Sequence, residues 1–170
     1  NEEQLLWVRQ DWLDALGIAA PKTLDELLAA ARAFANDDPN QNGKKDTYAF
    51  TSNGCGRGLG NAIEQYLAMW GPTDFYREDG IVKHPVLDGS HKAFLDFLRT
   101  LVREKLIAPD WYLQGSEAML DEVSLYQRIG FVFSAQMQMP AEGADGVRWT
   151  AIPIPQAAPR GGKHMPANPD

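Results

Sequence analysis

Apolar side chains recur at helical spacing in two long stretches of the chain. The first stretch repeats them every three or four positions, at Leu24, Leu27, Leu28, Ala31 and Phe34. It predicts a helix that ends near Asn36, with Thr23 and Glu26 forming a capping box at its start. The second stretch, roughly 89–105, places one apolar face at Phe94, Phe97, Leu98, Leu101 and Val102. Shorter amphipathic segments predict helices at 11–17, 61–71 and 116–127.

Short apolar runs between these segments predict strands. They are LLWVR (5–9), TYAFTS (47–52), GFVFSAQ (130–136) and RWTAIPIP (148–155). Asp79 and Gly80 stand between FYR and IVK and predict the tip of a hairpin. Because helices are interspersed with separated strands, the pattern indicates an α/β or α+β layout.

The composition limits what the chain can bind. Its 170 residues, 44% of them hydrophobic, are enough for one domain or for one lobe of something larger. A net charge of −7 and scattered basic residues argue against a nucleic-acid or anionic-membrane partner. No apolar run reaches roughly 18 residues, the length of a membrane span. The single cysteine, Cys55, excludes an internal disulfide, and we expect it to be a small residue in a glycine-rich turn.

The segment DPNQNGKKD, residues 38–46, carries oxygen-bearing side chains at alternate positions of an expected turn. Calcium loops of the EF-hand type supply ligands from positions 1, 3, 5, 7 and 9 around a glycine at position 6. Counted from the first Asp, the ligands are Asp38, Asn40, Asn42, the Lys44 carbonyl and Asp46, and Gly43 is at position 6. The spacing therefore predicts a calcium site with five protein ligands.

The end of this loop departs from a regulatory EF-hand. Position 12 is Ala49, where an EF-hand carries a bidentate glutamate, and position 8 is Lys45. With only two carboxylates, we expect modest affinity, water in the remaining ligand positions and a structural role. The alternative is a solvated turn, since Asp, Asn and Gly are the residues that turns are made of.

The order of these segments resembles the extracellular solute-binding proteins of family 1, the ligand receptors of ABC importers. LWVRQDWLDALGIAAPKTLDELLAAARAF is similar to that family's hinge strand, short helix and acidic-capped helix, and DPNQNGKKDTYAFT resembles its calcium loop. FLDFLRTLVREKLIAPDW and GFVFSAQ resemble its later helix and its ligand-side strand. In some members an acidic residue follows the last Asp of the loop. Thr47 stands there in this chain, which leaves the sixth ligand open.

The resemblance covers nearly the whole chain, which is well under half of a family member. It implies an α/β fold, one lobe of a two-lobed (type II) periplasmic-binding-protein fold that is helix-rich around a small sheet. Residues 1–155 would form the C-terminal ligand-binding lobe, and 156–170 a loose tail toward the hinge. The start at Asn1 without an initiator Met, together with this tail, leads us to expect an excerpt from a longer protein.

The resemblance also implies a function. The chain would be part of a monomeric receptor that closes over a sugar, oligosaccharide or peptide, does no chemistry and serves an ABC permease in the membrane. Ca2+ would be a structural ion. The receptor would lie at the extracellular face of the membrane or in the periplasm, lipid-anchored in the full-length protein.

Two stretches have the character of ligand-contacting loops in such a receptor. SNGCGRGLGN (52–61) lies between a predicted strand and a predicted helix, and its best polar candidates are Asn53 and Arg57. FSAQMQ (133–138) follows a predicted strand and offers Ser134 and Gln136. The alternatives are turn residues in water, a helix cap and a surface glutamine.

The tryptophans are the candidates for stacking against sugar rings. Trp70 and Trp149 are the expected platforms, although packing in the core is the alternative for both. Trp7 and Trp12 are expected to pack the first helix, and Trp111 to cap the core.

Two other functions compete with the receptor. A glycoside hydrolase needs two carboxylates across the scissile bond, and the adjacent Asp121 and Glu122 would point in different directions on a helix. The histidines, His84, His91 and His164, lack metal-ligand spacing, and G-x-S-x-G and H-E-x-x-H motifs are absent. The second competing function is a calcium-dependent interaction module. A second calcium loop would favour it, and the sequence shows one such loop.

Overall fold

The computed structural model describes residues 5–51, 66–72, 75–109, 111–112, 121, 123, 127–134, 146–157 and 163–164. Its main sheet has the strand order β2-β5-β1-β6. The strands are β1 (Leu5–Arg9), β2 (Tyr48–Phe50), β5 (Ile129–Ser134) and β6 (Trp149–Ile152). β1 lies antiparallel to β5 and β6, whereas β2 runs parallel to β5. All four predicted strands are therefore confirmed: β1 has the predicted bounds, β5 begins one residue earlier, and β2 and β6 are shorter.

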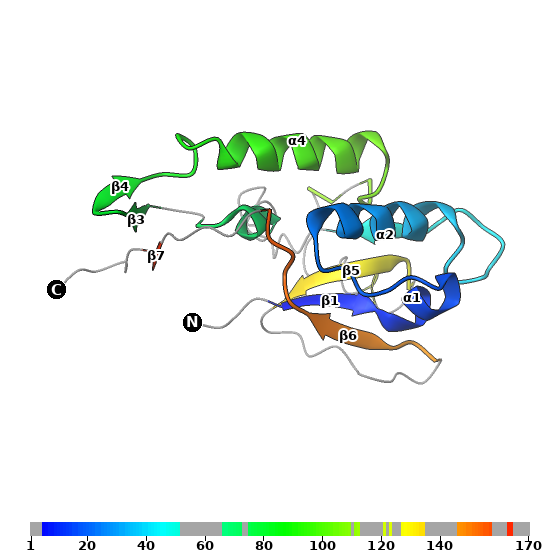
Figure 1. The fold of residues 1–170 in the computed structure, drawn as a ribbon. Coiled ribbons are helices and arrows are strands. Elements are labelled where there is room, and N and C mark those ends of the chain that lie inside the picture. The colour runs from blue at the N-terminus through cyan, green and yellow to red at the C-terminus, as the bar shows by residue number, and fades with distance from the viewer. Residues whose placement is uncertain are drawn as a thin grey trace.

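The helices are α1 (Gln10–Leu16), α2 (Leu24–Asn36), α4 (Ser90–Arg103) and the 3-10 turn η1 (Ala68–Trp70). Figure 1 shows α2 and α4 on the same side of the main sheet. The capping box of α2 is confirmed, because Glu26 N donates to Thr23 Oγ1 and Thr23 N donates to Glu26 Oε2, each at 3.2 Å. None of the described helices is long and apolar enough to cross a membrane. The helix expected at 116–127 falls mostly outside the described residues.

The core follows from the alternation of side chains along β1. Leu6 and Val8 join the large cluster beneath α2, whereas Trp7 packs against a second cluster that contains Val132 and Trp149. Phe34 of α2 holds the first cluster together: its ring lies 5.3 Å from that of Trp12 and 5.0 Å from that of Phe131. An apolar side of α2 therefore rests on an apolar face of the sheet, as the helical spacing predicted.

A second, smaller sheet lies at the N-terminal end of α4, apart from the main sheet (Figure 1). Its order is β4-β3-β7, with β3 (Tyr76–Glu78), β4 (Ile81–Lys83) and β7 (Lys163–His164). The hairpin predicted at Asp79 and Gly80 is confirmed, and both residues have the positive φ, 51° and 78°, that its tight turn requires. β7 comes from the segment expected to be a loose tail, so at least two residues of that tail pair with β3.

Candidate functional site

The loop between α2 and β2 turns tightly around Asp38. Asp38, Gln41 and Gly43 have φ values of 50°, 55° and 74°, in the left-handed region. One Asp38 carboxylate oxygen accepts a hydrogen bond from Asn42 N at 3.1 Å, and the other accepts one from Gly43 N at 2.9 Å. The first predicted calcium ligand therefore closes the loop onto its own fifth and sixth positions.

The later predicted ligands contact one another. Asn42 Nδ2 donates to both carboxylate oxygens of Asp46, at 3.1 and 3.3 Å, and Lys44 N donates to Asn42 Oδ1 at 2.8 Å. Asn40 Oδ1 is buried and accepts no hydrogen bond from any described residue. A buried oxygen without a donor is costly unless something electropositive approaches it.

Thr47 directs its side chain away from the loop. Its buried hydroxyl donates to the carbonyl oxygen of Phe34, in the last turn of α2, at 2.7 Å. Ala49, at the twelfth loop position, is fully buried within β2. Position 12 has no side-chain oxygen, and the hydroxyl at position 10 donates into the core, so neither residue adds a side-chain ligand to the predicted set.

The donor set is suited to a hard cation. It comprises two carboxylates, two side-chain amides and one backbone carbonyl, and Ca2+ prefers oxygen ligands of these kinds. Within the described part of the chain, no three His, Cys, Asp or Glu side chains gather at a point that could hold a metal. The loop residues fit calcium through their amide and carbonyl oxygens as much as through charge, and they do not fit zinc.

The second candidate region is the edge of the main sheet where β2 and β5 end. These strands run parallel, with Phe50 opposite Phe131, so their carboxyl ends face the same edge. Thr51 follows β2 there, and Ser134 is the last residue of β5. Both predicted ligand loops therefore begin at the same edge of the main sheet. Asn53, Arg57 and Gln136 lie outside the described residues.

Both tryptophans expected to stack against sugar are buried. Trp70 is 7% exposed, and its ring lies 5.7 Å from that of Phe94 and 5.1 Å from that of Phe97. Trp149 is 4% exposed and lies 5.7 Å from the guanidinium of Arg9. These contacts favour the packing role for both rings over the stacking role.

Arg9 is a central residue that the sequence did not single out. Its side chain is 3% exposed, stacks 4.6 Å from the centre of the Trp12 ring and forms an ion pair with Asp11 at 2.6 Å. A buried cation between aromatic rings is stable only with such a partner. The only sequence signal for the burial of Arg9 was the set of apolar and aromatic neighbours in LLWVR and DWL. These neighbours do not by themselves predict that the arginine is buried.

The chain is similar to three curated proteins, two of which are named for the carbohydrates that they bind or transport. It is 36% identical over 95 residues to the polygalacturonan/rhamnogalacturonan-binding protein YtcQ of Bacillus subtilis, which covers 55% of this chain and 19% of YtcQ. The fructooligosaccharide ABC transporter substrate-binding protein FusA of Streptococcus pneumoniae is 34% identical over 109 residues, 61% of this chain and 20% of FusA. Lipoprotein LipO of B. subtilis is 33% identical over 122 residues, 68% of this chain and 24% of LipO. No protein-family model matches the chain.

Solved structures agree with these relatives. An extracellular solute-binding protein from Bifidobacterium longum subsp. infantis superposes with a TM-score of 0.72 at 25% identity, over 90% of this chain and 33% of that structure. The chain is similar to one part of the extracellular solute-binding proteins. It spans about a fifth to a quarter of the length of the curated relatives, and this partial coverage fits one lobe of a two-lobed receptor. At family level, these relatives are binding proteins and not enzymes.

Two further solved structures share the fold. One is an EF-hand mutant of S. pneumoniae FusA in complex with fructo-nystose, with a TM-score of 0.70 at 23% identity over 90% of this chain and 31% of that structure. The other is the alginate-binding protein AlgQ2 without calcium ion. It superposes with a TM-score of 0.68 at 21% identity, over 88% of this chain and 32% of that structure. The expected α/β lobe of the two-lobed fold is thereby confirmed.

Proposed function

We propose that this chain is the C-terminal lobe of an ABC-importer receptor for a sugar or oligosaccharide. Its relation to YtcQ and FusA, whose names specify pectic polymers and fructooligosaccharides, is the observation that supports the proposal. In such a receptor the solute is enclosed between two lobes, and closure creates the surface that an ABC permease recognises. The chain supplies half of the enclosing wall and performs no covalent step.

We place the solute at the sheet edge where β2 and β5 end. Asn53 and Arg57 follow Thr51 by a few residues, and Gln136 follows Ser134 by two, so their loops start from neighbouring strand ends. Amide, guanidinium and hydroxyl groups are suited to donating hydrogen bonds to sugar hydroxyls. Because Trp70 and Trp149 are buried, we assign the contacts of this lobe to polar side chains rather than to these two rings.

We further propose that the loop 38–46 holds a structural Ca2+. Asp38, Asn40, Asn42 and Asp46 would supply side-chain oxygens, and Lys44 its carbonyl. Asn40 Oδ1, which accepts no hydrogen bond from the described residues, supports this proposal from within the loop, and the FusA and AlgQ2 structures support it from related receptors. Because the loop joins α2 to β2, an ion there would fix the start of the strand that leads to the solute edge.

The location of the receptor is proposed on the same basis. LipO is named a lipoprotein, and the B. longum neighbour is named an extracellular solute-binding protein. We infer a place at the extracellular face of the membrane or in the periplasm, with a lipid anchor in the full-length protein.

Titration calorimetry of the complete receptor that contains this chain tests the proposal, with kestose and oligogalacturonides as probes. We expect one of the two to bind, and Asn53→Ala or Gln136→Ala to weaken binding by about tenfold, as loss of a buried polar contact does. Gln156→Ala is the matched control, since Gln156 is exposed beyond β6. The chain by itself should bind the same probe far more weakly, because half of the contacts are missing.

Other outcomes would support the competing functions. Hydrolysed products in the titrated sample would indicate an enzyme. A calcium-dependent complex between this chain alone and another protein, without sugar binding, would indicate an interaction module. Micromolar binding of a small sugar by the lone chain would contradict the two-lobed arrangement.

A further inference from the structure

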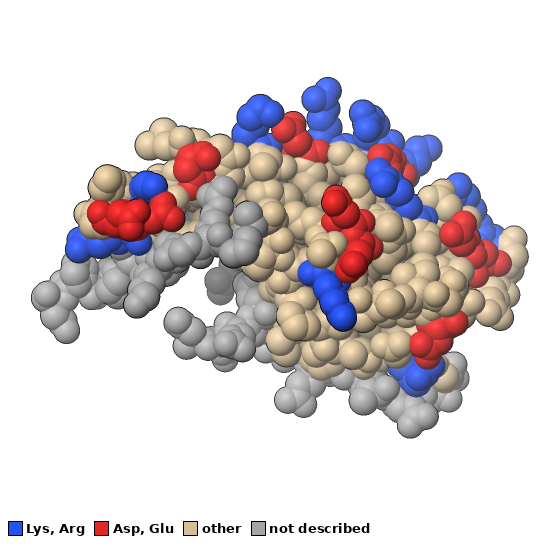
Figure 2. All heavy atoms as spheres, viewed as in Figure 1, with Lys and Arg blue, Asp and Glu red and all other residues tan. Residues whose placement is uncertain are grey.

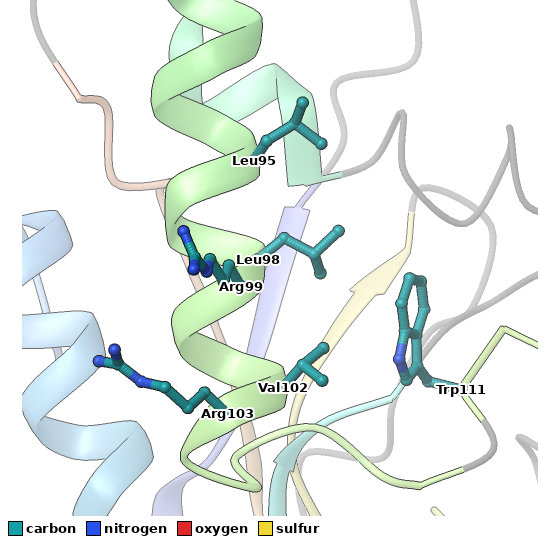
Figure 3. Close-up of a pocket in the computed structure, with 6 residues that line it drawn as sticks. All are labelled: Leu95, Leu98, Arg99, Val102, Arg103 and Trp111. Atoms are coloured by element: carbon teal, nitrogen blue, oxygen red, sulfur yellow. The ribbon is translucent and has the colours of Figure 1, made fainter.

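A groove lies between helix α4 and Trp111. Its first part is a hollow of about 410 Å3, lined by Leu95, Leu98, Arg99, Val102, Arg103 and Trp111 (Figure 3). A second hollow of about 320 Å3 shares Val102 and Trp111 with the first and extends to Tyr48 and Lys105. We call these two joined hollows the α4 groove.

The floor of the α4 groove is apolar and open to solvent. Figure 3 shows Leu95, Leu98 and Val102 on one side of α4, where they point toward Trp111. They are spaced three and four residues apart and so form a ridge along the helix. Leu95 and Val102 are 52% and 50% exposed, whereas Trp111 is 9% exposed and forms a wall. A contiguous apolar strip of this kind marks an interaction surface more often than single exposed residues do.

The border of the α4 groove is basic, although the chain carries a net charge of −7. Figure 2 shows Lys and Arg side chains gathered over α4. The nearby carboxylates of Asp96 and Glu104 each lie 2.7 Å from a basic side chain, Lys92 and Arg32 respectively. In the part of the chain that the structure describes, Arg99 and Lys105 form no ion pair, and Arg103 lies 3.8 Å from Glu104, which is already paired with Arg32. Five basic side chains, those of Arg32, Lys92, Arg99, Arg103 and Lys105, thus surround two carboxylates. The border therefore has positive charge left for a partner.

We propose that the α4 groove binds an acidic amphipathic helix of a partner protein. A ridge of residues at helical spacing fits between the side chains of a second helix, whose apolar residues would recur every three or four positions. Carboxylates beside that apolar stripe would meet Arg99, Arg103 and Lys105. The small exposed area of Trp111 does not offer the open ring face that a sugar needs for stacking.

This surface borders the proposed solute edge. The groove reaches Tyr48, the first residue of β2, and also Ala108, whose backbone N donates to the Phe50 carbonyl at the other end of that strand. The inference does not depend on which sugar the receptor binds.

Fluorescence anisotropy with two synthetic peptides tests the proposal. The first is a labelled helix of about 16 residues with leucine at the i, i+3, i+4 and i+7 positions and glutamate on both flanks. The second replaces every glutamate by lysine. We expect the acidic peptide to bind the complete receptor that contains this chain about tenfold tighter than the basic peptide at low salt, and the difference to shrink as salt is raised.

Variants locate the binding surface. Val102→Glu should weaken binding of the acidic peptide by about tenfold, because it places a carboxylate on the floor of the groove. The double substitution Arg99→Glu and Arg103→Glu should weaken binding by a similar factor, because it reverses the charge of the border. Val86→Glu is the matched control, because Val86 is 57% exposed on the turn before α4 and does not line the groove. Thermal melts check that each variant is folded.

Four results would overturn the proposal. Equal binding of the two peptides would show that the basic border does not select the partner. Unchanged binding by folded Val102→Glu would show that the peptide does not bind in the groove. If the chain dimerises at micromolar concentration and Val102→Glu makes it monomeric, the occupant is a second copy. If an oligogalacturonide binds and the same variants abolish its binding, the groove is a sugar site.

Discussion

The hydroxyl of Thr47 donates a 2.7 Å hydrogen bond to the carbonyl oxygen of Phe34. This contact joins the end of the candidate calcium loop to the last turn of α2, thirteen residues earlier. The same helix turn places the Phe34 ring between Trp12 and Phe131 in the core. The position of the loop is therefore tied directly to the packing of α2 on the sheet.

We expect Thr47→Val to destabilise the chain. Valine keeps the shape but leaves a buried carbonyl without its donor, which typically costs about 1–3 kcal/mol. For a chain of this length each kcal/mol lowers Tm by roughly 2–4 °C. A thermal melt measures the change. Thr100→Val is the control, because Thr100 makes a similar bond to the Asp96 carbonyl on the exposed side of α4. Equal effects of the two substitutions would contradict the role assigned to Thr47.

Local patterns predicted the regular elements well. α2 was predicted from its spacing and capping box, and the β3–β4 hairpin from Asp79 and Gly80, because each signal acts within a few residues. The partner of Thr47 could not be predicted in this way, since a hydroxyl has many possible acceptors and the fold selects one. The enclosure of Arg9 beside Trp149 likewise depends on β1 and β6 becoming neighbours.

The candidate sites likewise divide into features that depend on local sequence and features that depend on tertiary contacts. The loop ligands were predicted from a fixed spacing, and the contacts among Asp38, Asn42 and Asp46 agree with a loop closed around those positions. The tryptophan platforms depended on exposure, which a sequence does not specify. Trp70 lies against Phe94 and Phe97 because α4 packs beside η1, and no local sequence pattern predicts that contact.

Gly130 should not tolerate a side chain. A Cβ at this position of β5 would lie 2.2 Å from Cδ2 of Phe34, so the ring or the strand must move. We expect Gly130→Ala to lower the free energy of unfolding by about 1–3 kcal/mol, as overpacking does. Chemical denaturation measures this loss. In a Phe34→Leu background the added methyl meets a smaller side chain, so the loss should be smaller; an equal loss would show that the clash with Phe34 is not its cause.

The ion pair between Arg32 and Glu104 joins α2 to the C-terminal end of α4 and should make stability depend on pH. The hydrogen bond from Arg32, at 2.7 Å, lowers the pKa of the Glu104 carboxyl below its usual range. A carboxyl whose pKa is lower in the folded state contributes stability above its unfolded pKa of about 4.3, and loses it as pH falls through the folded pKa.

The Tm difference between the chain and Arg32→Gln should therefore be largest near neutral pH and vanish in strong acid. Raised salt should also reduce the difference, because both groups are partly exposed. Melts across a pH series measure it. Arg77→Gln, which removes an equal charge from an exposed side chain of β3 that forms no ion pair among the described residues, is the control for a general charge effect. A difference that stays constant below pH 4 would refute the assignment to Glu104.

Calcium should raise the melting temperature of the chain if the loop 38–46 holds it. Saturation to a hundred times Kd stabilises a folded protein by about 2.7 kcal/mol, or roughly 5–10 °C in Tm here. We expect that rise with millimolar CaCl2 over EDTA, but not with MgCl2, because the loop offers few carboxylates and no rigid octahedral site. Asp38→Ala should abolish it, whereas Asp37→Ala, an exposed neighbour outside the predicted ligand set, should not. If Asp37→Ala and Asp38→Ala respond to calcium alike, the loop is a turn closed by its own hydrogen bonds, and Asn40 Oδ1 requires another explanation.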